Sequence, residues 1–321
     1  MYPVYPAEVE VARMKLSVVI PAYDEAENVK PLLDELYEVL DASFPENEVL
    51  VVDDGSRDDT LRRLLEEKEN RPTLKVIEFQ GNFGQTAAID AAFREASGDV
   101  IVLLDADMQN DPRDIPRMVA RLDDGYDVVC GWRFDRKDTL GKRFTSRGAN
   151  LLRKIILRDD IHDSGCTLKA LRGECVKGLH LHGEMHRFIP ALLQWRGFKI
   201  TEEKVNHRSR HRGKTKYNLF RVGRGLMDML VVRFWQKYSA RPAHFFGFLG
   251  LLSSMAGFAI CAYLAVLKLG GESIGDRPLL LLGVLGIIIG LQFITFGLLA
   301  DMLAKIFFRD ARPYVIRRVH D

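Results

Sequence analysis

The sequence predicts an α/β domain with a mostly parallel sheet, followed by two membrane-spanning helices. Short apolar runs alternate with amphipathic helical patterns over residues 15–216, a pattern typical of parallel strands joined by crossover helices. Acidic side chains directly follow three of the apolar runs. Two uncharged stretches, residues 245–267 and 279–300, are each long enough to cross about 30 Å of hydrocarbon.

The α/β domain is expected to contain five strands with helices between them. We expect strands at residues 16–20, 48–52, 74–78, 100–104 and 127–131, because each is a short apolar run. A helical repeat covers residues 28–40. Ser56 and Asp59 resemble a capping box for a second helix that ends near residue 68. A third helix ends near residue 97, and the alternation implies right-handed crossovers.

The most informative motif is Asp-Ala-Asp-Met-Gln at residues 105–109, directly after the apolar run at residues 100–104. Two carboxylates and an amide oxygen are hard ligands that suit Mg²⁺ or Mn²⁺, ions that also bind substrate phosphates. In open α/β sheets, ligands bind beyond the carboxyl ends of the strands. The motif therefore predicts a metal-bound diphosphate. An acidic loop that caps the next helix is the alternative.

Two further strand ends carry polar groups of the same kind. The three pairs are Asp24 with Glu25, Asp53 with Asp54, and Asp105 with Asp107. One such pair is unremarkable because Asp favours caps and turns, but three at equivalent ends of one sheet converge on a single crevice. No G-x-G-x-x-G follows the first strand and no Walker A sequence occurs, which disfavours a dehydrogenase or a P-loop enzyme.

The composition excludes further classes of protein. The 321-residue chain has a net charge of +2, so no global basic field favours nucleic acid as a partner. Its four cysteines are scattered without a CxxC pair, which indicates neither a disulfide framework nor a zinc site. Residues 1–15 carry charges and lack an apolar centre, so we expect no signal peptide and a cytoplasmic N-terminal part.

The two uncharged stretches read as a transmembrane hairpin with a short Gly-rich connection. Basic residues flank both outer ends, at Arg233, Lys237 and Arg241 before the first span and at five positions after the second. The positive-inside rule therefore places both ends and the α/β domain in the cytoplasm. The expected order is a tail (1–14), the α/β domain (15–216), interfacial helices (217–244), the hairpin (245–304) and a basic tail (305–321). Gly286 and Gly290 form a GxxxG that we expect to pack helices, within the hairpin or between subunits.

Several segments together resemble glycosyltransferase family 2, which has the GT-A fold. They are VIPAYDE (19–25), VVDDGS (51–56), NFG (82–84) and DADMQ (105–109). More narrowly, the chain resembles the polyprenyl-phosphate glycosyltransferases, the group of dolichyl-phosphate mannose synthase and the GtrB-type enzymes. The segments that support this are GWR (131–133), SRGAN (146–150), DSGC (163–166), HRFIP (186–190) and GKTKY (213–217).

The resemblance implies roles for particular residues. The nucleotide sugar would be bound by Pro21, Tyr23, Glu25, Asp53, Asp54, Gln85, Asp105, Ala106 and Asp107. Asp107 and Gln109 would hold Mg²⁺ or Mn²⁺, and the phosphate of the lipid acceptor would be bound by Arg133, Arg143, Ser146 and Arg147. Asp105, Asp107, Arg133 and Arg147 would act in catalysis. The family often has Lys where this chain has Gln85, and Lys142 competes with Arg143 and Arg147 for the acceptor role.

The predicted reaction moves a sugar from a UDP- or GDP-sugar to the phosphate of undecaprenol or dolichol, with inversion at the anomeric carbon. The acceptor phosphate needs positioning and charge neutralisation, which arginine supplies through bidentate hydrogen bonds. The basic stretch at residues 133–153 fits that need; the alternative is a surface that faces anionic lipid headgroups. The basic run at residues 207–212 reads either as a membrane anchor or as a loop that closes over the donor phosphates. Homo-oligomers, such as tetramers, follow from the resemblance.

Three other functions compete with this one. A processive family 2 polysaccharide synthase would carry a Gln-x-x-Arg-Trp motif and more spans, whereas this chain has Gln194-Trp195-Arg196. A non-catalytic, membrane-tethered scaffold would have no use for an intact acidic motif. A sugar nucleotidyltransferase would have no use for the lipid-side arginines or for the hairpin.

Overall fold

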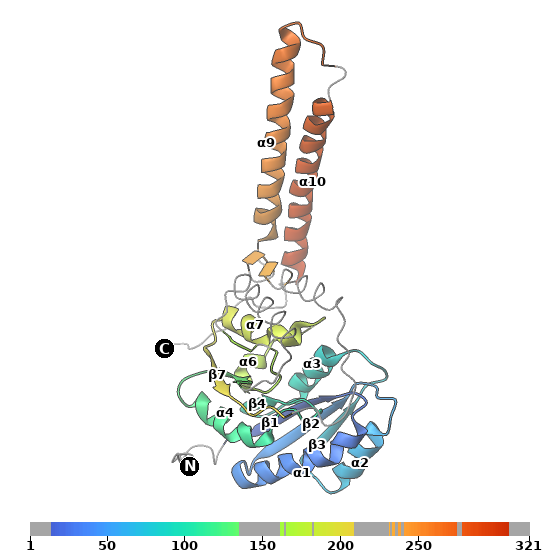
Figure 1. Ribbon diagram of the computed structural model, residues 1–321, viewed down its shortest axis with the longest axis vertical. Helices are drawn as coiled ribbons and strands as arrows, with labels where there is room; N and C mark the ends of the chain where they lie inside the picture. The colour runs from blue at the N-terminus through green and yellow to red at the C-terminus, as the bar shows by residue number, and fades with distance from the viewer. Residues whose placement is uncertain are drawn as a thin grey trace. The chain divides into compact units, whose positions relative to one another are not determined.

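The computed structural model describes residues 14–134, 161–163, 165–181, 183–208, 231, 233–234, 237–238, 241–274 and 278–307. The chain divides into two units, Met1–Val232 and Arg233–Asp321, which are described separately below. The first unit contains a mixed β-sheet with helices on both faces, and the second contains two long helices (Figure 1). The predicted α/β architecture followed by an apolar hairpin is confirmed.

The sheet of the first unit has seven strands in the order β3-β2-β1-β4-β6-β5-β7. Their bounds in that order are Leu74–Glu78, Asn47–Asp53, Leu16–Ala22, Val100–Leu103, Lys169–Arg172, Val128–Trp132 and Ile200–Lys204. β3, β2, β1 and β4 run parallel, β6 is antiparallel to both of its neighbours, and β7 is parallel to β5. All five predicted strands are present, but β6 and β7 were not predicted.

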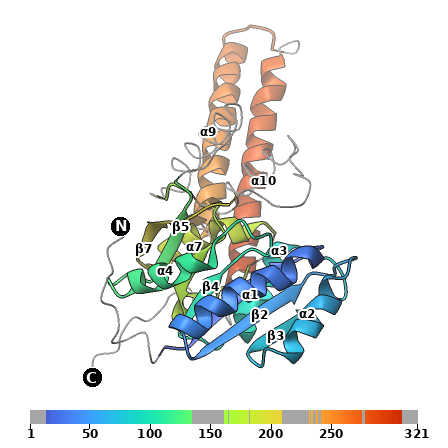
Figure 2. The ribbon, with the colours of Figure 1, turned by 60° about the horizontal axis from the view of Figure 1, so that its bottom comes forward.

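Helices cover both faces of this sheet. One face packs against α1 (Ala26–Ser43), α2 (Thr60–Glu69) and α4 (Ile115–Leu122). The other face packs against α3 (Gln85–Glu95), α6 (Gly173–Val176) and α7 (Ile189–Trp195). Figures 1 and 2 show the two helical layers on opposite sides of the strands. Both faces of the central strands are therefore buried, which explains why these strands are continuous apolar runs.

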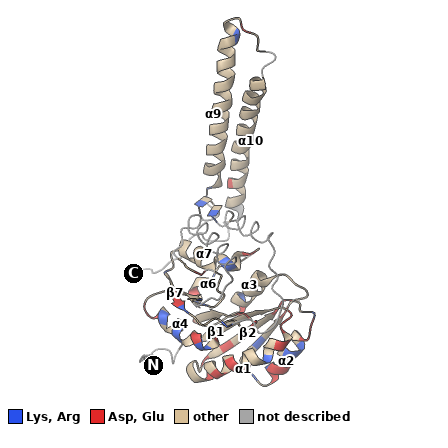
Figure 3. Ribbon diagram, in the orientation of Figure 1, with Lys and Arg blue, Asp and Glu red and all other residues tan. Residues whose placement is uncertain are grey.

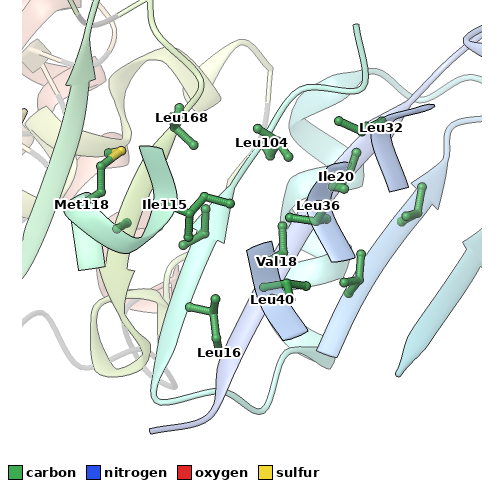
Figure 4. Packing of buried hydrophobic residues seen from close by; sticks show 14 of the residues in the cluster. Leu16, Val18, Ile20, Leu32, Leu36, Leu40, Leu104, Ile115, Met118 and Leu168 are labelled. Atoms are coloured by element: carbon green, nitrogen blue, oxygen red, sulfur yellow. The ribbon is translucent and has the colours of Figure 1, made fainter. Parts of the chain in front are cut away.

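The central strands alternate their side chains between the two layers. In β1, Val18 and Ile20 join the cluster under α1, whereas Val19 joins the cluster on the opposite face. Figure 4 shows Leu32, Leu36 and Leu40 of α1 over the first of these faces, spaced by about one helical turn. This packing holds the strands in register with the helices, and the acidic residues follow the carboxyl ends of these strands.

One local prediction was wrong. The second helix starts at Thr60, with Asp59 at its N-cap, so Ser56 does not cap it. The Ser56 hydroxyl instead donates to Asp53 Oδ1 at 2.5 Å and accepts the backbone N–H of Asp24 at 3.0 Å. Ser56 therefore ties the end of β2 to the end of β1, a non-local contact that a capping pattern could not reveal.

The second unit contains α9 (Pro242–Leu269) and α10 (Pro278–Phe307), which pack against each other along their length. Both helices are long and apolar enough to cross a membrane, and only 17 % and 11 % of their most apolar segments are buried. Figure 3 shows almost no charged residues between their ends. A soluble core helix would bury such a surface, so the exposed apolar faces fit a lipid environment.

Glycines allow the close approach of α9 and α10. A Cβ atom added to Gly290 would lie 2.5 Å from the carbonyl oxygen of Gly250, and one added to Gly257 would lie 2.5 Å from that of Gly283. The Ser253 hydroxyl donates to the carbonyl oxygen of Gly286 at 2.8 Å. The predicted GxxxG therefore packs helices within the hairpin, as small residues do between membrane helices.

Candidate active site

A cavity of about 420 Å³ opens where β1, β2 and β4 end. These three strands are adjacent and parallel, so their carboxyl ends meet at one edge of the sheet. The cavity is lined by Pro21, Ala22, Tyr23, Glu25, Asp54, Asn82, Gly84, Gln85, Asp105, Ala106 and Asp107. Except for Asp53, all residues that the sequence assigned to the nucleotide sugar line this cavity. Their individual roles remain predictions.

The loop after β1 forms the first wall. Asp24 adopts a left-handed backbone conformation with φ 55°, which is uncommon for a residue with a side chain. Its carboxylate accepts the backbone N–H of Arg57 at 2.7 Å. The backbone N–H of Glu25 donates to the Thr60 hydroxyl at 2.9 Å. These contacts join the loop after β1 to the loop after β2, so the wall that holds Tyr23 and Glu25 is rigidly supported.

The two acidic residues at the end of β2 have different positions. Asp53 is buried and binds Ser56, outside the cavity lining. The Asp54 carboxylate accepts the backbone N–H groups of Phe83 at 2.7 Å and Gly84 at 2.9 Å. Burial raises the pKa of Asp54, the two backbone donors oppose the rise, and the Asp53 charge adds to it. Asp54 therefore shapes the turn at residues 82–84 as well as lining the cavity.

Asp105 follows β4 and is held from two sides. The Gln85 side-chain amide donates to Asp105 Oδ1 at 2.9 Å, and the Thr167 hydroxyl donates from the strand side. Burial raises the pKa of Asp105 to about 6, and the Asp107 carboxylate adds to the rise, while Thr167, Lys169 and Arg133 oppose it. Gln85, at the position where the family often has Lys, thus contacts an acidic residue of the cavity.

The turn that contains Asp107 and Gln109 is also left-handed, since Met108 has φ 58°. The backbone N–H of Gln109 donates to Asp107 Oδ1 at 3.1 Å. Asp107 lines the cavity, whereas Gln109 lies beside it and is partly exposed. Within the described residues, no three His, Cys, Asp or Glu side chains converge as a metal cage. The donor set fits a hard divalent ion that takes its other ligands from phosphates and water.

Arg133 follows β5 and forms a bidentate ion pair with Asp163. Its Nε lies 2.7 Å from Asp163 Oδ2 and its Nη2 lies 2.9 Å from Oδ1. Burial alone would lower the pKa of this guanidinium, but the Asp163 carboxylate outweighs burial and raises it. Arg133 is therefore a fixed cation whose position depends on Asp163. Lys142, Arg143, Ser146 and Arg147 lie outside the described residues.

Two features near the site were missed in the sequence. Lys169 on β6 is 2 % exposed, donates to the carbonyl oxygen of Cys166, and places a buried positive charge near Asp105. A lone Lys inside the apolar run at residues 168–171 was the available signal, because a buried lysine requires a partner. The second feature is a contact of residues 206–208 with the turn at residues 109–111. The sequence singled out the basic run at residues 207–212 but not this contact, and residues 209–212 lie outside the described residues.

Comparisons with known proteins identify the family of the chain. The model of the glycosyl transferase family 2 matches residues 17–178. The chain is 41 % identical to a dodecaprenyl-phosphate galacturonate synthase of Rhizobium johnstonii, over 97 % of this chain and 94 % of the relative. It is 35 % identical to an undecaprenyl-phosphate 4-deoxy-4-formamido-L-arabinose transferase of Yersinia enterocolitica, over 95 % and 93 % respectively.

The fold also matches a solved structure. Glucosyl-3-phosphoglycerate synthase from Mycobacterium tuberculosis, in complex with Mn²⁺, UDP and phosphoglyceric acid, superimposes with a TM-score of 0.55 at 21 % identity. The match covers 69 % of this chain and 78 % of that one, and at this identity it shows the fold alone. The family model and the two relatives together establish that the chain belongs to glycosyltransferase family 2, and both of these relatives are polyprenyl-phosphate sugar transferases.

Proposed function

We propose that this enzyme transfers a sugar from a UDP- or GDP-sugar to a membrane polyprenyl phosphate, with Mg²⁺ or Mn²⁺ and with inversion at the anomeric carbon. The observation that carries the proposal is the cavity at the ends of β1, β2 and β4, which gathers Glu25, Asp54, Asp105 and Asp107. A nucleoside diphosphate needs such oxygen donors only if a divalent cation lies between them. The apolar hairpin in the same chain matches a lipid acceptor.

We assign a separate role to each residue in or beside the cavity. Asp107 and Gln109 would hold the metal, which when bound neutralises the charge that develops on the leaving diphosphate. Asp105, held by Gln85 and Thr167, would orient the donor sugar and its diphosphate. Tyr23 and the turn that Asp54 organises would enclose the nucleoside.

The phosphate of the lipid acceptor supplies the nucleophilic oxygen itself. A phosphate monoester is mostly ionised at neutral pH because its second pKa is about 6, so it needs no strong general base. One of its oxygens attacks the anomeric carbon while the bond to the nucleoside diphosphate breaks, and the diphosphate leaves with the electron pair. Direct attack opposite the leaving group inverts the centre. Arg133, Arg143 and Arg147 would bind the acceptor phosphate and neutralise its charge, and the Ser146 hydroxyl would donate a hydrogen bond to it.

We also propose that both ends of the hairpin, and with them the catalytic domain, face the cytoplasm. An even number of spans returns the chain to its starting side, and basic residues flank the outer ends of the hairpin. A homo-oligomer, such as a tetramer, remains a prediction from the family resemblance. Light scattering on the detergent-solubilised protein measures it directly.

The test uses purified protein in detergent with undecaprenyl or dolichyl phosphate. Radiolabelled UDP- and GDP-sugars, including UDP-galacturonate because of the first relative, are offered singly with Mn²⁺ or with EDTA. We expect label to enter the organic phase from one donor and to stay in water with EDTA. Asp107→Asn should lower transfer about 100-fold or more, because a metal–phosphate interaction is worth several kcal/mol.

Asp123→Asn is the matched control, since Asp123 is an exposed acid at the end of α4, outside the cavity. It should transfer sugar at the wild-type rate. Sugar transfer that persists in EDTA would show that the reaction does not need a divalent metal. If the protein binds a nucleotide but transfers sugar from no donor, the scaffold function is supported. The anomeric configuration of the product, measured by NMR coupling constants, tests inversion.

A further inference from the structure

The segment at residues 206–208, directly after β7 and Val205, is bound to the turn that follows Asp107. We name residues 206–208 the exit segment and residues 107–111 the acidic turn. The backbone N–H of Arg208 donates to the carbonyl oxygen of Gln109 at 2.9 Å. Asn110 and His207 form an isolated antiparallel bridge beside it. The backbone of Gln109 is therefore held by a part of the chain about 100 residues away in the sequence.

The Arg208 guanidinium adds a second link at the same place. Its Nη2 lies 2.8 Å from Asp111 Oδ2 and its Nη1 lies 2.6 Å from Glu35 Oε2. The other Asp111 oxygen accepts the backbone N–H of Arg113 at 3.1 Å and so caps the following 3₁₀ turn. One planar guanidinium thus joins the exit segment, the acidic turn and α1, with a geometry that lysine cannot reproduce.

The acidic turn needs such support. Met108 holds a left-handed backbone conformation, which is unfavourable for a residue with a side chain and persists only where the surroundings determine it. Within the turn, the backbone N–H of Gln109 donates to Asp107 Oδ1 at 3.1 Å. In the proposed function Asp107 and Gln109 hold the cation, so its binding would depend on the position of Gln109 relative to Asp107.

A neighbouring contact supplies an internal control. Asn206 donates to the buried Asp114 at 2.6 Å and 3.1 Å. Arg117 on α4 lies 2.7 Å from Asp114 and also donates to the carbonyl oxygen of Lys204 at 2.7 Å. Arg117 therefore fastens the end of β7 to α4 with a comparable set of bonds. Among the described residues, Arg117 binds neither Gln109 nor Asp111.

We propose that Arg208 is a positioning residue for the divalent cation: it holds the acidic turn so that Gln109 stands beside Asp107 as a ligand. This inference rests on the metal-dependent function proposed above. Replacing residues that orient metal ligands typically lowers metal affinity or activity 10–100-fold.

The test compares Mn²⁺ binding and turnover in Arg208→Gln, Arg208→Lys, Asp111→Asn and the control Arg117→Gln. Mn²⁺ binding is measured by the loss of the free-ion EPR signal in the presence of UDP or GDP, and turnover by sugar transfer over a range of Mn²⁺ concentrations. We expect Arg208→Gln to raise the half-saturating Mn²⁺ concentration about 10-fold in both assays. The maximal rate at saturating Mn²⁺ should stay within about 3-fold.

The other variants separate positioning from general stability. Arg208→Lys should show an intermediate effect, because one ammonium cannot bind Asp111 and Glu35 in the same fork. Asp111→Asn breaks the same link with little change in shape, so it tests the inference even if Arg208→Gln fails to fold. Arg117→Gln should lower the thermal midpoint without changing the half-saturating Mn²⁺ concentration.

The outcomes that overturn the two proposals differ. If wild-type protein binds Mn²⁺ with a nucleotide and Arg208→Gln and Asp111→Asn bind it equally well, the positioning role is wrong and the proposed function stands. An equal rise in Arg117→Gln would also refute positioning, since it would show a general loss of support. If wild-type protein binds no Mn²⁺ with either nucleotide, the metal-dependent function itself fails.

Discussion

Single residues shape the cavity mainly through the backbone. Asp24 and Met108 are the described non-glycine residues with positive φ, and each lies in a loop that contributes side chains to the cavity or its metal motif. Such conformations cost about 1–3 kcal/mol and cluster at functional sites. The contacts that hold them come from other loops, at Ser56, Arg57 and Arg208. The site is thus assembled from loops that stabilise one another.

Gly55 shows how little space these loops leave. It has φ 67°, and an added Cβ atom would lie 2.6 Å from Gly81 Cα and 2.8 Å from Asn82 N. Gly55→Ala should therefore lower stability by about 2 kcal/mol or more, and should weaken UDP or GDP binding because it displaces the turn that Asp54 organises. Thermal unfolding and nucleotide titration in detergent measure the two effects.

Gly125→Ala is the control for Gly55→Ala. Gly125 also has a positive φ, 87°, but an added Cβ atom would meet nothing within 4 Å. It carries the backbone strain without the collision, so its loss of stability should be near 1 kcal/mol and nucleotide binding should not change. Equal effects of the two substitutions would show that the contact between the loops is unimportant.

Glu48 is a buried acid at the opposite end of the sheet, and it predicts a pH dependence of stability. Burial alone would raise its pKa, but hydrogen bonds from Lys75, Ser17 and Ser97 outweigh burial and lower the pKa to about 2. A folded-state pKa below the unfolded value of 4.5 means that the ionised carboxylate stabilises the fold above pH 4.5. That contribution is lost as the pH falls from 4.5 towards 2.

Glu48→Gln should reduce the free energy of unfolding at pH 7 by about 1–3 kcal/mol. The difference from wild type should shrink as the pH falls below 4.5, because the wild-type carboxyl then becomes protonated. Thermal midpoints measured from pH 7 to pH 3 check this. The exposed neighbour Glu46 provides the control substitution Glu46→Gln, which should have little effect. A difference for Glu48→Gln that stays constant across this range would contradict the assignment.

At the scale of elements, adjacency of strands explains the site and glycine spacing explains the hairpin. β2, β1 and β4 lie side by side and parallel, so the residues that follow them meet although they are about 30 to 80 residues apart in the sequence. In the hairpin, Gly250, Gly257, Gly283 and Gly290 lie where one helix backbone touches the other. Both arrangements follow from repeats that can be read along the chain.

The glycine contact predicts a position-specific effect in the hairpin. Gly290→Leu should separate α9 from α10, because even a Cβ atom would lie 2.5 Å from the Gly250 carbonyl oxygen. Overpacking of this kind costs about 1–3 kcal/mol, so the thermal midpoint in detergent should fall. Gly247→Leu is the control, since nothing lies within 4 Å of its added Cβ. Equal midpoints for the two variants would argue against this packing.

At the scale of the whole molecule, the chain combines a soluble sugar-transfer domain with a membrane hairpin. The exposed apolar surface of α9 and α10 marks it as a membrane protein. A polyprenyl phosphate has its reactive phosphate at the membrane surface and its lipid within the membrane. An enzyme that is itself anchored meets such an acceptor without having to extract it. The side on which the domain lies decides which nucleotide pool it uses.

The proposed orientation predicts the labelling of single cysteines. Glu272→Cys, in the connection after α9, should react with a membrane-impermeant maleimide in intact cells. Asp123→Cys, in the catalytic domain, should react only after lysis. Three native cysteines, Cys130, Cys166 and Cys175, are buried, which lowers the background. The reverse pattern of labelling would show the opposite topology. Equal labelling of the two cysteines would mean that the hairpin does not span the membrane.

The sequence alone was enough for most features that depend on local repeats and short motifs, the capping box at Ser56 and the strands β6 and β7 being exceptions. The five strands, both apolar helices and the acidic motif after β4 follow from hydrophobic periodicity and from residue types at strand ends. The convergence of acidic residues from three strand ends could be predicted because parallel strands bring their carboxyl ends together, whereas their assignment to a nucleotide sugar came from the family resemblance and stays a prediction. The roles of Gly286 and Gly290 could be predicted because GxxxG acts between neighbouring helices.

Tertiary structure decided the contacts that no local pattern encodes. In the folded chain, β6 lies antiparallel between β4 and β5, and Arg133 pairs with Asp163. Ser56, predicted to cap a helix, links two loops instead. The fold also brings Arg208 to Gln109 and the buried Lys169 close to Asp105. The physical reason is the same in each case. Periodicity reports the environment of a residue, whereas its partners depend on which distant segments the packed core brings to the same place.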